Sequence, residues 1–96
     1  MLDALTADSF EAQVGTEFHA ADAASTLVLA EVTRFPSQPE APRTEPFSLV
    51  FTGNPGSVLP QQIHALEHPV LGRLNIFLVP IGPAPTGEMR YEAVFN

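Results

Sequence analysis

Proline and glycine interrupt this sequence so often that mostly short elements of secondary structure fit between them. The 96 residues include 10 prolines and 6 glycines, and many of these stand between runs rich in β-branched or alternating apolar residues. Such strand-like runs lie at 16–20, 25–35, 46–53, 61–68, 72–82 and 89–96. We therefore predict a mainly β fold, a compact antiparallel barrel or sandwich of about six strands.

Alternation within two of these runs predicts their geometry. The run 72–82 contains Pro80, which indicates a bend or a bulge near its end. In the run 25–35, uninterrupted alternation divides the side chains between two faces, with Leu27, Leu29, Glu31 and Thr33 on one face and Val28, Ala30, Val32 and Arg34 on the other.

One short helix is predicted before the strands. Thr6 followed by ADSFEA indicates a helix cap and one or two turns, which Gly15 ends. Asp8 and Glu11 suit the positive end of the helix dipole. Residues 36–46 form a proline-rich loop, which we expect to be a connection within a single domain of residues 1–96.

Composition and charge exclude several classes of function. The formal net charge is −7, and the cationic side chains are four arginines at positions 34, 43, 73 and 90. A nucleic acid or an anionic membrane requires a cationic face, so we predict neither as a partner. Cysteine is absent, which excludes disulfides, thiolate metal sites and cysteine nucleophiles.

The start, MLDALTADSF, lacks the features of a signal peptide, and we expect a soluble cytoplasmic protein.

The motif H-x-x-E-H, formed by His64, Glu67 and His68, is the signature of one class of zinc peptidases. On a helix, both histidines reach one metal and the glutamate activates its water. On a strand, residues four apart are separated by about 13 Å, too far for one zinc ion. Pro60 and Pro69 leave room for two helical turns at most. We therefore favour a strand in which Glu67 faces water and His68-Pro69 opens a turn.

A zinc-dependent hydrolase, with His64 and His68 as ligands and Glu67 as the base, is the alternative to this interpretation. No other pattern indicates an enzyme. Ser57 lacks the G-x-S-x-G context of a nucleophile, and Glu88 and Glu92 are typical of a solvated strand face. We predict no catalytic residue, no metal and no cofactor.

The favoured function is a non-enzymatic protein-interaction or assembly module that binds another protein or itself. The last strand has no lysine or proline to protect an exposed edge, and the run 72–82 is more apolar than a strand with one wet face. Arg73, Phe77 and Tyr91 are the predicted interface residues, since arginine and aromatic side chains anchor interfaces. A binder of a small apolar ligand inside the barrel is a third interpretation.

Four segments of the chain are distinctive: LPQ at 59–61, LEHPVLG at 66–72, IFLVP at 76–80 and YEAVFN at 91–96. In these segments the chain resembles a family of small bacterial proteins classified as a domain of unknown function. The resemblance implies a bacterial single-domain protein and an association with phage-tail-collar-like fibre proteins. It implies no catalytic residues.

Overall fold

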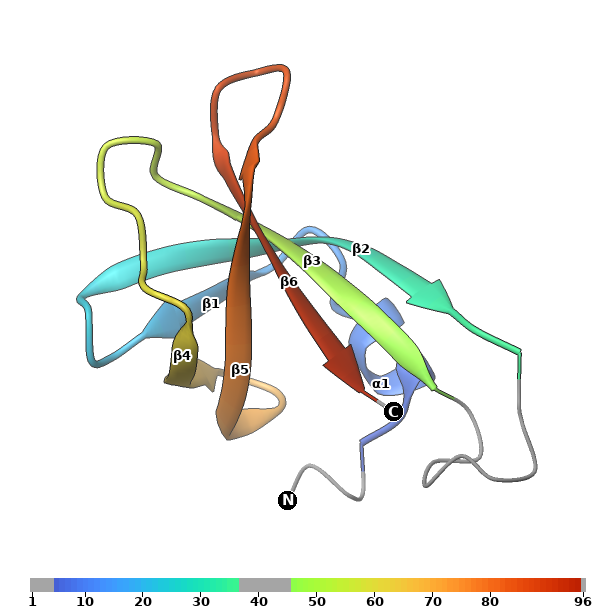
Figure 1. The fold of residues 1–96 in the computed structure, drawn as a ribbon. Helices are drawn as coiled ribbons and strands as arrows, with labels where there is room; N and C mark the ends of the chain where they lie inside the picture. The colour runs from blue at the N-terminus through green and yellow to red at the C-terminus, as the bar shows by residue number, and fades with distance from the viewer. Residues whose placement is uncertain (1–4, 37–45, 96) are drawn as a thin grey trace.

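The short alternating runs form β-strands that close into an antiparallel barrel, with a helix at one end (Figure 1). The computed structural model describes residues 5–36 and 46–95. Most of the predicted proline-rich loop, residues 37–45, lies outside this described part. Within it, the elements are α1 (Ala7–Glu11), β1 (Glu17–Ala20), β2 (Ser25–Arg34), β3 (Phe47–Gly53), β4 (Gln62–His68), β5 (Gly72–Pro83) and β6 (Met89–Phe95).

Every strand pairing is antiparallel, and the order around the barrel is β1-β2-β3-β6-β5-β4. A short pairing of His19 with Glu67 and of Ala20 with Leu66 joins β4 back to β1. The prediction of a mainly β fold is confirmed, and the architecture is a barrel rather than a sandwich. Within the described residues, no helix is long and apolar enough to cross a membrane.

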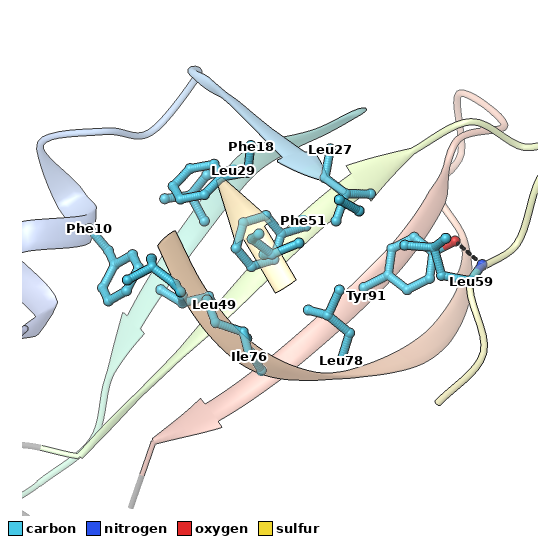
Figure 2. Packing of buried hydrophobic residues seen from close by; sticks show 14 of the residues in the cluster. Phe10, Phe18, Leu27, Leu29, Leu49, Phe51, Leu59, Ile76, Leu78 and Tyr91 are labelled. Carbon is cyan, nitrogen blue, oxygen red and sulfur yellow. Dashed lines mark hydrogen bonds between the residues drawn. The ribbon is translucent and has the colours of Figure 1, made fainter. Parts of the chain in front are cut away.

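Alternate side chains of the strands fill the interior (Figure 2). In β3, for example, Phe47, Leu49 and Phe51 are fully buried. Phe51 meets Phe18 of β1 edge to face, with ring centroids 5.2 Å apart. Burial of each such side chain contributes about 1.5–3 kcal/mol to folding, so the apolar alternation in the sequence is the main cause of the fold.

A β-bulge at Ala30 divides β2 into two parts with opposite alternation. Leu29 pairs with Phe51 whereas Glu31 pairs with Val50, so Ala30 is an additional residue without a partner position. Beyond the bulge, Val32 joins the residues that pack against the core. The prediction that Val32 shares a face with Val28 and Ala30 is wrong, because one inserted residue reverses the side-chain alternation that follows it.

Helix α1 covers the end of the barrel at which β2 and β6 finish and β3 begins (Figure 1). Its buried Phe10 ring lies 5.8 Å from the Phe47 ring and 5.7 Å from the Phe95 ring. Outside this contact, Arg34 of β2 forms ion pairs with Asp8 and with Glu11, the latter at 2.6 Å. Hydrogen bonds to these two carboxylates raise the pKa of Arg34. The predicted helix is thus confirmed, and its carboxylates bind an arginine.

Strand β5 changes partner along its length. Gly72–Leu78 pairs with β4, whereas Val79–Pro83 pairs with β6. The change lies close to an irregularity between Pro80 and Gly82, which confirms the bulge predicted at this proline. Below the paired part, β5 and β6 diverge (Figure 1).

Strand β6 pairs with β3 from Met89 to Phe95 and with β5 through its first half. Met89–Glu92 of β6 therefore has a strand on both sides, whereas Ala93–Phe95 has β3 as its one partner strand among the described residues, so the last strand presents an open edge in part. The apolar character of the run 72–82 has two causes, since Leu74, Ile76 and Leu78 fill the core while Phe77 and Ile81 remain exposed.

Candidate functional site

The H-x-x-E-H motif lies on strand β4, as the favoured interpretation predicted. His64 and His68 both face the interior and are 1% and 5% exposed, while Glu67 is exposed on the other face. The strand sets the two histidines about 13 Å apart along the chain direction. Each imidazole therefore has its own surroundings.

Both ring nitrogens of His64 lie next to oxygen atoms. Nδ1 lies 3.0 Å from Oδ2 of Asp22, in the turn between β1 and β2, and Nε2 lies 2.8 Å from the backbone oxygen of Pro60. The carbonyl oxygen can only accept, so Nε2 carries a proton and donates it. These two contacts fix the β1–β2 turn and the segment before β4 against the strand.

His68 holds the turn between β4 and β5. Its Nδ1 accepts the backbone N–H groups of Val70 at 3.0 Å and of Leu71 at 3.2 Å. The proton therefore lies on Nε2, which donates to Oγ1 of Thr16 at 2.9 Å. The Thr16 hydroxyl in turn donates to the backbone oxygen of Gln13 at 2.7 Å. Burial lowers the pKa of His68, which agrees with a neutral ring.

These contacts leave no shared metal site in the motif. A zinc ion would have to displace a structural hydrogen bond from each histidine, and one ion could not reach both. In residues 5–36 and 46–95, no group of three or more histidine, cysteine, aspartate or glutamate side chains could hold a metal ion. The arrangement indicates that both histidines stabilise turns.

The outer surface of β4 and β5 offers a different candidate. Ile63 pairs directly with Phe77, and these side chains are 63% and 48% exposed. Four positions further along each strand, Glu67 pairs with Arg73, which places opposite charges side by side. We call this surface the outer β4–β5 face, and it consists of Ile63, Ala65, Glu67, Arg73, Asn75 and Phe77.

The structure separates the three predicted interface residues. Arg73 and Phe77 lie on the same outer face of β5, four positions apart. Tyr91 is fully buried, and its hydroxyl accepts the backbone N–H of Leu59 at 2.9 Å (Figure 2). Tyr91 is therefore a core residue that ties the β3–β4 connection to β6, while the interface role of Arg73 and Phe77 stays a prediction.

Sequence reasoning missed Ile63 as a surface residue. The signal was present, because alternation that turns His64, Leu66 and His68 inward also turns Ile63 outward. The strand register that pairs Ile63 with Phe77 cannot be read from local sequence.

The edge of β5 adds a second property to this region. Gly72–Leu78 has β4 on one side, and no strand of the described residues pairs with it on the other. We call this side of Gly72–Leu78 the β5 edge. Alternate N–H and C=O groups of such a strand point away from its partner and can pair with another chain.

The chain belongs to DUF6916, a family described as a domain of unknown function, whose model matches residues 5–95. This match confirms the resemblance to a small family of that description. No curated protein and no solved structure matches the chain. Family membership therefore supplies no activity, and function has to be inferred from the surface and the buried groups.

Proposed function

We propose that this protein is a non-enzymatic interaction module that binds another protein chain through the outer β4–β5 face. The observation that carries the proposal is the exposed pair formed by Ile63 and Phe77. The two large apolar side chains lie next to each other on rigid, paired strands. A partner can therefore bury both without reorganising the barrel.

The energetics of this pair support a protein partner. Complete burial of an isoleucine or phenylalanine side chain is worth about 1.5–3 kcal/mol, and aromatic side chains are common anchors of interfaces. Glu67 and Arg73 lie on the same face, four positions along each strand from the apolar pair and beyond Ala65 and Asn75, where charges contribute orientation more than affinity. With a formal charge of −7, the chain is poorly suited to binding nucleic acid.

The buried groups favour no competing activity. The histidine nitrogens of the zinc-hydrolase alternative already form hydrogen bonds to the backbone or to neighbouring side chains. The barrel interior that a small apolar ligand would need is occupied by the core side chains themselves. We therefore do not propose either function.

The partner class that we propose follows from the sequence resemblance. Fibre subunits of phage-tail-like particles are the candidates, and the interaction would then take place in the bacterial cytoplasm, where such particles assemble. An extended fibre surface with apolar side chains has the chemistry that Ile63 and Phe77 require.

A capture experiment with matched variants tests the proposal. The immobilised chain is exposed to lysate of the source cells, and bound proteins are quantified for wild type, Ile63→Thr, Phe77→Thr and Val14→Thr. Threonine keeps β-propensity while removing apolar area, and Val14 is an exposed apolar residue outside the face. We expect Ile63→Thr and Phe77→Thr each to capture at least about tenfold less of a stoichiometric partner than wild type does, whereas Val14→Thr captures the wild-type amount. Full retention by Ile63→Thr and Phe77→Thr would refute the proposal.

A further inference from the structure

We propose that the β5 edge pairs with the same edge of a second copy of this chain, antiparallel and centred on Asn75. The proposal rests on the proposed function, because Phe77 belongs to both surfaces and a second copy is one form of protein partner. It adds a defined occupant, a defined register and a two-fold axis.

The available length of edge sets the register. Beyond Leu78, β5 is already paired with β6, and before Gly72 the chain turns back to β4. Two antiparallel copies of Gly72–Leu78 overlap completely only when the two-fold axis passes through the midpoint of the segment. That midpoint is Asn75, and every other register gives up backbone hydrogen bonds.

Side-chain chemistry agrees with this register. When Asn75 faces itself across the axis, Arg73 of each copy lies opposite Phe77 of the other, on the outer surface. The guanidinium and the ring can then form a cation–π contact, and it occurs twice. Asn75 can form an amide hydrogen bond to its symmetry mate. A register centred on Arg73 would instead place two like charges opposite each other.

A second copy fits this edge better than an arbitrary peptide does. Antiparallel pairing about one residue is self-complementary, since each contact occurs twice, and such two-fold dimers are the commonest form of oligomer. The three side chains that meet on the outer surface, Arg73, Asn75 and Phe77, are all exposed in the single chain.

Cysteine cross-linking tests the register directly, because the chain contains no cysteine of its own. Asn75→Cys places two thiols opposite each other at a Cα separation of about 4.5–5.5 Å, which is within the range of a disulfide. Arg73→Cys and Phe77→Cys each lie about 13 Å from their own counterparts in this register. In an equimolar mixture of these two variants, the cysteine at position 73 of one copy lies opposite the cysteine at position 77 of the other copy.

The expected result under mild oxidation is a covalent dimer of Asn75→Cys that forms at least tenfold faster than that of Arg73→Cys or Phe77→Cys alone. The mixture of Arg73→Cys with Phe77→Cys is expected to form the mixed dimer at a rate close to that of Asn75→Cys. Equal rates for all single variants, or no covalent dimer of Asn75→Cys, would overturn the proposed register.

Sedimentation equilibrium separates this proposal from the proposed function. Asn75→Arg sets two cations against each other at the axis, so we expect it to abolish a dimer that Ile63→Thr and Val14→Thr retain. Loss of the dimer in Ile63→Thr but not in Asn75→Arg would overturn edge pairing and support flat packing of the outer β4–β5 face. A wild-type chain that is monomeric at all concentrations would overturn self-association, while the capture experiment would still decide the proposed function.

Discussion

Nδ1 of His64 lies 3.0 Å from Oδ2 of Asp22, so a buried histidine of β4 is tied to the turn between β1 and β2. Asp22→Ala leaves a buried ring nitrogen without its partner, and we expect a loss of about 1–2 kcal/mol in the free energy of unfolding. Asp8→Ala removes a carboxylate that is 82% exposed in its pair with Arg34 and should cost less than Asp22→Ala, because water screens exposed ion pairs. Urea denaturation of both variants checks the order, and a reversed order would show that the Asp22 contact is dispensable.

The occupied imidazoles predict the response to zinc. Because Nδ1 of His68 accepts two backbone N–H groups and Nε2 contacts Thr16, metal binding would have to break contacts that hold the β4–β5 turn. We expect a stoichiometric amount of Zn²⁺ to leave the Tm unchanged. A rise in Tm that disappears in His64→Ala and in His68→Ala would contradict the structural role of both histidines.

The lowered pKa of His68 predicts a dependence of stability on pH. The unfolded chain binds a proton at this residue near its ordinary pKa of 6.5, whereas burial makes the folded chain bind it only at lower pH. The stabilisation is therefore complete above about pH 6.5 and is lost progressively below it, by at most about 1.4 kcal/mol per pH unit. Urea midpoints between pH 5 and pH 8 measure the slope. His68→Gln should reduce it, and an unchanged slope would assign it to other groups.

Gly53 lies where two core side chains approach the backbone closely. A Cβ atom at this position would lie 2.7 Å from Cδ2 of Leu27 and 3.3 Å from a ring carbon of Tyr91. We expect Gly53→Ala to cost about 1–3 kcal/mol through overpacking. The matched control is Gly56→Ala, where the nearest atom is the Asn54 side-chain oxygen at 3.4 Å, and its Tm should change much less. Equal melting temperatures for the two variants would contradict this packing.

The bulge in β2 accommodates one residue more than a regular ladder needs. Deleting Ala30 would leave Leu29 paired with Phe51 and Val32 paired with Leu49, whereas deleting Val32 would remove a residue that packs against the core and bring Thr33 to its place. We expect the deletion of Val32 to destabilise the fold by more than about 2 kcal/mol and the deletion of Ala30 to cost much less. Thermal unfolding measures both, and equal losses would contradict the assignment of Ala30 as the additional residue.

Local sequence predicted the elements well because proline and glycine stand at their ends. Pro60 and Pro69 limited the His64–His68 segment to a length that suits a strand, and the two histidines shared a buried face as alternation required. Pro80 indicated the irregularity of β5. These signals are local, and each has a direct backbone cause.

Pairing between strands could not be predicted in the same way. Nothing near Ala30 distinguishes a bulge from regular alternation, because the inserted residue is itself compatible with a strand. The burial of Tyr91 depends on the register of β6 with β3 and β5, which the sequence alone does not show. The β5 edge arises from the point at which β5 changes partner, which is a property of the whole barrel.

Site-specific photo-crosslinking in the source cells measures most directly whether the outer β4–β5 face binds a protein chain. A photo-reactive phenylalanine analogue replaces Phe77 in one strain and Val14 in another. We expect irradiation to produce a discrete covalent adduct with a second protein chain from position 77 and none from position 14. An absence of adducts at position 77, or equal products from both positions, would contradict an interaction module that uses this face.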